Sequence, residues 1–152
     1  MSEVTIRQAV QTDLPVLVKL FGQLTVDGSE GIPLPLAEQV WRRIAQYPDY
    51  RVYVAESEGT IIGSFSLLIL DQLGHKGQAS GIVESVVVER ACRGQGVGKR
   101  MMHLAMDRCR EAGCYKLALS SNVQRPSAHA FYESLGFTRQ GYSFEIEMKP
   151  AP

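Results

Sequence analysis

The sequence predicts a mixed α/β (α+β) fold, in which helices pack against one central sheet. Three observations lead to this prediction. Apolar patterns typical of strands alternate with helical ones; three strand-like segments in the middle follow one another without a helix; and a glycine-rich turn joins the last of these to a helix. Because consecutive strands in the middle pair antiparallel, a doubly wound dinucleotide-binding fold is disfavoured.

The elements are expected in the order strand, two helices, three strands, helix, strand, helix and terminal strand. Alternating or continuous apolar residues predict strands at 4–9, 51–56, 60–70, 81–89, 115–121 and 143–148. Helices are expected from Thr12 or Asp13 to Leu24, and over 36–47, 97–112 and 126–136. Residues 27–35 are expected to form a loop and 57–59 a hairpin turn. The run of valines at 86–88 indicates a central strand.

The composition excludes several functional classes. A chain of 152 residues suits a single domain over residues 1–152. Its sixteen basic and sixteen acidic residues cancel, so we expect neither nucleic acid nor a membrane as partner. Apolar runs fall far short of the ~20 residues of a membrane helix. The first residues lack the pattern of a signal peptide, which favours a cytoplasmic location.

The cysteines and histidines show no metal-binding pattern. Three cysteines are an odd number without a repeated spacing, which favours reduced thiols over a disulfide framework. The histidines are dispersed along the chain and no metal site is expected. The residues concerned are Cys92, Cys109, Cys114, His75, His103 and His129.

A glycine-rich turn lies between the strongest strand and the strongest helix. Its backbone N–H groups and the start of the helix favour an anion, and a pyrophosphate is the natural ligand. A Walker A loop would need Gly at Arg93 and Ser or Thr at Arg100, and a Rossmann pattern starting at Gly94 would need Gly at Lys99. Neither fits; the remaining pattern is [QR]-x-x-G-x-[GA]. The cradle comprises Arg93, Gly94, Gln95, Gly96, Val97, Gly98 and Lys99.

A second signature follows about 30 residues downstream. It reads A-x-x-F-Y-x-x-x-G-F and comprises Ala128, Phe131, Tyr132, Gly136 and Phe137. With both signatures in this order, separated by a helix and a strand, the chain resembles the GNAT acyltransferase superfamily over nearly its whole length. The resemblance implies a sheet of six to seven strands, splayed between strands 4 and 5 and flanked by about four helices.

The resemblance also implies a ligand and its contacts. Acetyl-CoA would lie in the gap between strands 4 and 5 as co-substrate, with no metal. Its pantetheine arm would pair with the main chain of Val86, Val87 and Val88, and its pyrophosphate would lie on the cradle. Backbone N–H groups near Val86 or Val87 would polarise the acetyl carbonyl. Transfer would be direct, within a ternary complex.

Two side chains are candidates for the chemistry. Attack on a thioester needs a neutral amine, and Glu84 is the single acid inside the strongest strand, so it is the candidate base, acting directly or through water. Alternatively it binds substrate or has a structural role. Tyr132 matches the tyrosine of the family and is the candidate acid for the departing thiolate, with packing in the core as the alternative.

One departure from the family concerns the pantetheine contact. Many members carry Asn seven residues before the tyrosine, where this chain has Arg125, and Asn122 lies three residues earlier. Both are candidate CoA contacts. Arg125 could instead bind an anionic substrate or be a solvated loop cation.

The acceptor is expected to be the primary amine of a small molecule. Residues 113–116 resemble glucosamine-phosphate acetyltransferases, although these carry an acid where this chain has Ser85. The pattern N-V-x-R-x-x-A-H-x-F-Y from Asn122 resembles aminoalkylphosphonate acetyltransferases. A peptide or lysine acceptor and a non-catalytic CoA-binding module remain alternatives. Apolar and polar residues alternate at 142–148, a pattern that fits either a strand in a homodimer contact or an ordinary half-buried strand.

Overall fold

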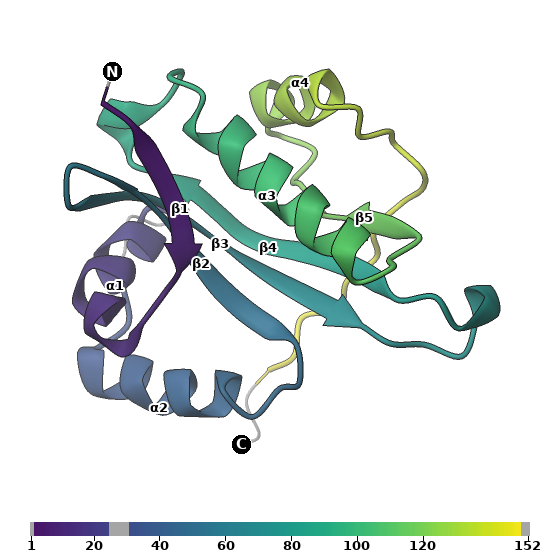
Figure 1. Cartoon of the computed structure of the whole chain (residues 1–152), viewed down its shortest axis with the longest axis horizontal. Coiled ribbons are helices and arrows are strands. Elements are labelled where there is room, and N and C mark those ends of the chain that lie inside the picture. Colours follow the sequence, from purple (N-terminus) through teal and green to yellow (C-terminus); the bar gives the residue numbers. More distant parts are fainter. Residues whose placement is uncertain (1, 25–30, 150–152) are drawn as a thin grey trace. The chain divides into compact units, whose positions relative to one another are not determined.

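A computed structural model describes residues 2–24 and 31–149 of the chain. It divides the chain into two compact units, with the boundary between Leu119 and Ser120. The first unit holds one sheet and three α-helices, and the second holds one α-helix (Figure 1). None of the described helices has the length and apolar character that crossing a membrane requires.

The sheet of the first unit has the strand order β1-β2-β3-β4-β5. Neighbouring strands are antiparallel except β4 and β5, which are parallel. The strands are β1 (Val4–Gln8), β2 (Tyr50–Ser57), β3 (Thr60–Leu70), β4 (Ser80–Val88) and β5 (Lys116–Ala118). The helices are α1 (Leu14–Gly22), α2 (Leu34–Ile44) and α3 (Val97–Glu111), with α4 (Pro126–Ser134) in the second unit.

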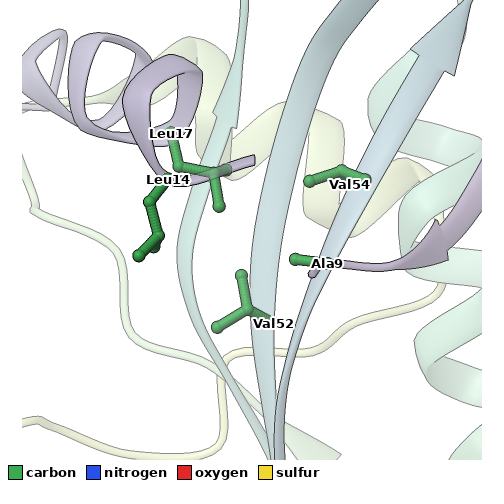
Figure 2. Packing of buried hydrophobic residues seen from close by; sticks show 5 residues of the cluster. All are labelled: Ala9, Leu14, Leu17, Val52 and Val54. Atoms are coloured by element: carbon green, nitrogen blue, oxygen red, sulfur yellow. The ribbon is translucent and has the colours of Figure 1, made fainter. Parts of the chain in front are cut away.

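One face of the sheet packs against α1 and α2. Val52 and Val54 of β2 are buried there with Leu14 and Leu17 of α1 (Figure 2). Because side chains alternate along a strand, these even-numbered positions define one face of β2. Trp41 of α2 packs against the same cluster, so this tryptophan is a core residue.

The opposite face packs against α3. Phe65 of β3 and Met101 of α3 are fully buried. A Cβ atom on Gly63 would lie 3.2 Å from the sulfur of Met101, and one on Gly81 would lie 2.3 Å from the Sγ of Cys109. Both glycines therefore let α3 approach the sheet closely.

The contact between β4 and β5 is short. The parallel pairing runs from Ser80↔Lys116 to Ile82↔Ala118, whereas β4 continues to Val88. The part of β4 beyond Ile82 therefore has β3 as its paired neighbour on one side and no paired strand of the first unit on the other. Such an edge offers main-chain hydrogen-bonding groups to a ligand.

Two expectations about the elements need correction. The sheet has five strands in the described part of the chain rather than six to seven, because residues 143–148 are not a strand there. Alternation alone did not distinguish an extended exposed segment from a strand. In addition, α2 begins at Leu34, earlier than expected, because Pro35 occupies its first turn, where no N–H is needed. Of the expected loop 27–35, residues 27–30 lie outside the described residues.

An ion-pair network anchors β1 to the start of α1. The guanidinium of Arg7 donates to both carboxylate oxygens of Asp13, at 2.8 and 3.0 Å, and to Glu56 at 2.8 Å. The same Asp13 carboxylate accepts the N–H of Val10, so it holds the preceding turn rather than capping α1. Hydrogen bonding from Arg7 is the main cause that lowers the pKa of Asp13.

Replacing Asp13 by Asn is expected to lower the free energy of unfolding by about 1 kcal/mol at neutral pH. The effect is no larger because Arg7 is over one-third exposed, and water screens its attraction to the carboxylate. A carboxylate whose pKa is lowered by folding stabilises the protein above its unfolded pKa of about 3.9, and this stability is lost as the pH falls through the folded pKa. The free energy of urea unfolding should therefore fall between pH 7 and pH 3 in the wild type, and it should fall by up to about 1 kcal/mol less in Asp13→Asn. Asp49→Asn, in the exposed pair with Arg51, is the control without effect.

Candidate active site

A β-bulge interrupts β4 beside its unpaired edge. Glu84 pairs with Ser66 and Val87 with Ser64, so two residues of β4, Ser85 and Val86, lie opposite one residue of β3. Ser85 has a φ of 54°, a left-handed conformation that is uncommon for a residue with a side chain. Bulges free main-chain groups from the ladder and often lie next to active sites.

The pairing of the strands determines which face of the sheet carries Glu84. Its pairing partner Ser66 pairs in turn with Val52, which packs on α1, so Glu84 lies on the α1–α2 face of the sheet. Its side chain is exposed and makes no hydrogen bond or ion pair within the described residues. A rigid strand thus presents a free carboxylate beside the freed backbone of the bulge.

The glycine-rich turn connects β4 to α3. Gly94 and Gly96 have φ of 76° and 83°, where a side chain would be strained, and a Cβ atom on either would meet no atom within 4 Å. Gly96 is the N-cap of α3 and gives no side-chain cap, so the first N–H groups of the helix, from Val97 to Lys99, lack intrahelical acceptors. N–H groups without intrahelical acceptors at a helix start, next to glycines that present no side chain, fit a pyrophosphate.

The side chain of Arg93 has a structural role in this turn. Its Nε donates to the main-chain oxygen of Val88 at 3.1 Å, which ties the turn to the end of β4. Val86, Val87 and Val88 are half-buried or buried, with their main chain on the edge that β5 leaves unpaired. The cradle and the proposed pantetheine-binding strand are therefore continuous.

A contact that the sequence did not reveal supports the end of β4. Gln23, just after α1, donates from Nε2 to Glu89 Oε2 at 2.9 Å, and Glu89 also accepts the N–H of Arg90. The other amide atom of Gln23, Oε1, is buried without a hydrogen-bond partner among the described residues. No local pattern signals a contact between residues 66 positions apart.

The second unit explains the spacing of its signature. Gly136 has a φ of 97° and ends α4, so that the N–H of Phe137 reaches the oxygen of Tyr132 at 3.1 Å. The two rings then meet edge to face, with centroids 5.7 Å apart. Burial raises the pKa of Tyr132, opposed by the positive charge of Arg125. The phenol is therefore fully protonated at neutral pH.

Asn122 and Arg125 lie in the turn before α4. The Oδ1 of Asn122 accepts the N–H of Gln124 at 2.8 Å, and its main-chain oxygen lies 2.7 Å from the Nε2 of His129. The side-chain oxygen of Asn122 thus stabilises the turn. Arg125 is exposed and acts electrostatically on Tyr132, so a cation and a phenol lie near each other in this unit.

The remaining candidates do not form a second site. His75 stacks on Tyr115, with ring centroids 4.1 Å apart, so it is an ordered aromatic contact rather than a freely solvated loop residue. Searching the described residues finds no group of His, Cys, Asp or Glu arranged to hold a metal. In the first unit Glu84 lies beside the bulge within β4 and the cradle follows the end of that strand, and in the second unit Asn122 and Arg125 lie in the turn before the helix that carries Tyr132.

Comparisons with known proteins agree with this arrangement. Residues 23–137 match the Acetyltransferase (GNAT) family. The chain is 34% identical to glucosamine 6-phosphate N-acetyltransferase of Trypanosoma brucei brucei, over 96% of this chain and 97% of the relative. It is 30% identical to aminoalkylphosphonate N-acetyltransferase of Salmonella typhimurium, over 64% and 62%. The crystal structure of glucosamine-6-phosphate N-acetyltransferase from Arabidopsis thaliana superposes with a TM-score of 0.84, at 28% identity, over 97% and 100%.

These findings remove the uncertainty that short motifs carry. The family match spans both signatures, and the relative from Trypanosoma extends over nearly the whole of both chains. The chain belongs to the GNAT family of acetyltransferases and is an enzyme of the acyltransferase class.

Proposed function

We propose that this enzyme transfers the acetyl group of acetyl-CoA directly to the primary amine of a small molecule that carries a phosphate or phosphonate, with glucosamine 6-phosphate as the first substrate to test. The main support for this proposal is the similarity to glucosamine 6-phosphate N-acetyltransferase, which extends over nearly the whole length of both chains. A second relative, aminoalkylphosphonate N-acetyltransferase, is also named for an amine that carries a phosphorus oxyanion. Ser85, where the glucosamine-phosphate subgroup carries an acid, is the departure that the test must address.

The residues have separate roles in this proposal. The N–H groups from Arg93 to Lys99 bind the pyrophosphate of the donor, and the free edge of β4 binds its pantetheine arm. Glu84 accepts the proton of the amine, directly or through water, and an N–H group of the bulge stabilises the charge on the carbonyl oxygen. Tyr132 gives its proton to the departing sulfur. Arg125 attracts the anionic group of CoA or of the acceptor.

Release of free thiol from acetyl-CoA tests this function. Glucosamine 6-phosphate, glucosamine, an aminoalkylphosphonate and a lysine peptide should be compared at equal concentration. We expect kcat/KM to be highest for a phosphorylated or phosphonylated amine. Preference for the peptide would replace the proposal by peptide acetylation. Tight CoA binding without turnover of any acceptor would indicate a non-catalytic module.

Tyr132→Phe is expected to lower kcat on the order of 100-fold and to leave CoA affinity nearly unchanged, since the ring is kept and only the hydroxyl group that donates the proton is removed. The donor form of the phenol is the protonated one, and burial raises its pKa. On the alkaline side, wild-type kcat should therefore fall only above the ordinary titration range of a tyrosine phenol, and the variant should lack that alkaline decline. A collapse of CoA affinity measured by calorimetry would instead assign Tyr132 a packing role.

We further propose that two copies associate through residues 142–148. Tyr142, Phe144, Ile146 and Met148 are 80–91% exposed, so four large apolar side chains close together in the sequence face solvent. A second copy of the chain supplies the same four side chains and can bury both sets symmetrically. In analytical ultracentrifugation, Phe144→Glu should shift a dimer to monomer, whereas Ser143→Glu, which adds the same charge at a polar position, should not. A wild-type monomer at all concentrations would refute this contact.

A further inference from the structure

The C-terminus of α3 brings two cysteines together. The chain leaves the helix through Gly113, which has a φ of 72°, and the N–H of Cys114 donates to the oxygen of Cys109 at 2.9 Å. The N–H of Gly113 donates to the oxygen of Arg110 at 3.1 Å. This pair of bonds defines a Schellman motif, in which the side chains of the two outer residues face each other.

The same motif at the end of α4 shows the consequence directly. There the corresponding outer residues are Tyr132 and Phe137, whose N–H···O bond has the same spacing, and their rings are in contact. At the end of α3 both outer side chains are thiols, so Cys109 and Cys114 occupy the contact positions. The motif holds the two backbones at a separation compatible with a disulfide, which usually requires Cα atoms about 4.4–6.8 Å apart.

The two thiols differ in their access to solvent. Cys109 is 5% exposed and lies beneath Gly81 of β4. Burial, together with the neighbouring thiol of Cys114, raises the pKa of Cys109 to about 12. Cys114 is half-buried and therefore accessible to a small reagent, as is Cys92 before the cradle.

We propose that Cys109 and Cys114 are a modification site, which a peroxide oxidises to an intrachain disulfide. The thiolate of Cys114 attacks one peroxide oxygen, the O–O bond breaks and hydroxide leaves, which gives a sulfenic acid. The sulfur of Cys109 then loses its proton and displaces the sulfenic oxygen as water. In total, two thiols and one hydrogen peroxide give one disulfide and two waters, and the sulfurs supply both electrons.

The two cysteines lie on the elements that join the cradle helix to β5. Cys109 belongs to α3, which begins at the cradle, and Cys114 comes just before β5. The disulfide would fasten the start of β5 to the end of α3. The disulfide does not depend on which amine the enzyme accepts, because the two cysteines meet at the helix end and their state is measured by thiol blocking rather than by turnover.

Peptide mapping of the full chain tests the proposal. The native protein is treated with hydrogen peroxide, free thiols are then blocked under denaturing conditions, and trypsin is added. Cleavage after Arg108, Arg110 and Lys116 separates the two cysteines, so their fragments stay together only through a disulfide. We expect this linked pair, with Cys92 alkylated, and its loss on treatment with dithiothreitol.

Variants and conditions make the test decisive. Cys92→Ser should leave the link intact, and Cys114→Ser should abolish it while leaving the remaining thiols blockable. The link should form faster in the native protein than in urea, and faster as the pH rises, because Cys109 must lose a proton. Three alkylated cysteines after oxidation, a link to Cys92, or a higher oxide of Cys114 without a link would each overturn the proposal.

Discussion

Replacing Glu84 by Gln is expected to lower kcat on the order of 100-fold, with the affinity for CoA unchanged. Gln keeps the size of the side chain but cannot accept the proton of the attacking amine at neutral pH. Because the Glu84 carboxylate is exposed and has no hydrogen-bond or ion-pair partner among the described residues, the fold should not depend on it. Thiol release and calorimetric CoA binding measure the two quantities separately.

The alternatives for Glu84 give different results in the same assay. A carboxylate that only binds the substrate ammonium would raise KM in the variant and leave kcat nearly unchanged. A structural carboxylate would lower the melting temperature. Glu3→Gln, at an exposed position just before β1, is the matched control, since it makes the same chemical change outside α1, α2 and β4 and should alter neither kcat nor KM.

Gly96→Ala is expected to weaken CoA binding by about tenfold or more. At a φ of 83° an alanine costs about 1–2 kcal/mol, so the turn either stays strained or moves its N–H groups away from the pyrophosphate. The open space around Gly96 means that the loss arises from backbone conformation and from crowding of the ligand rather than from a clash within the protein.

A glycine at the other end of the same helix separates binding from stability. Gly113 also has a positive φ, 72°, and open space around it, and α3 places it roughly 20 Å from the cradle. Gly113→Ala should therefore lower the melting temperature to a similar extent and leave the CoA dissociation constant unchanged. Equal loss of CoA affinity in both variants would remove Gly96 from the cradle.

The elements around the cradle could be predicted because several local signals agree there. The valine-rich strand, the glycine-rich turn and the apolar stripe of α3 each fix one boundary, and Gly113 fixes the last. The residues of the proposed cradle could be named for the same reason, since a motif specifies backbone geometry. Resemblance to the family then suggested the proposed roles of Glu84 and Tyr132, which local patterns alone do not.

The errors fall where local signals are ambiguous or long-range contacts decide. Alternation of apolar and polar residues, as at 142–148, also occurs in exposed segments that are not strands, so the prediction of a terminal strand was wrong. The bulge depends on how β4 pairs with β3, and the positive φ of Ser85 has no glycine to announce it. The bond between Gln23 and Glu89 joins distant parts of the chain and is invisible in any short window.

The bulge in β4 has a consequence for how such an enzyme can change. Glu84 faces α1 and α2, whereas the turn after the same strand leads into α3, which packs on the opposite face. In the proposed mechanism, one face of a single strand meets the amine and its far end meets the donor. If the amine binds at Glu84 as proposed, substitutions in α1 and α2 should alter the range of amines accepted without disturbing the cradle, so that acceptor specificity can evolve separately from donor binding.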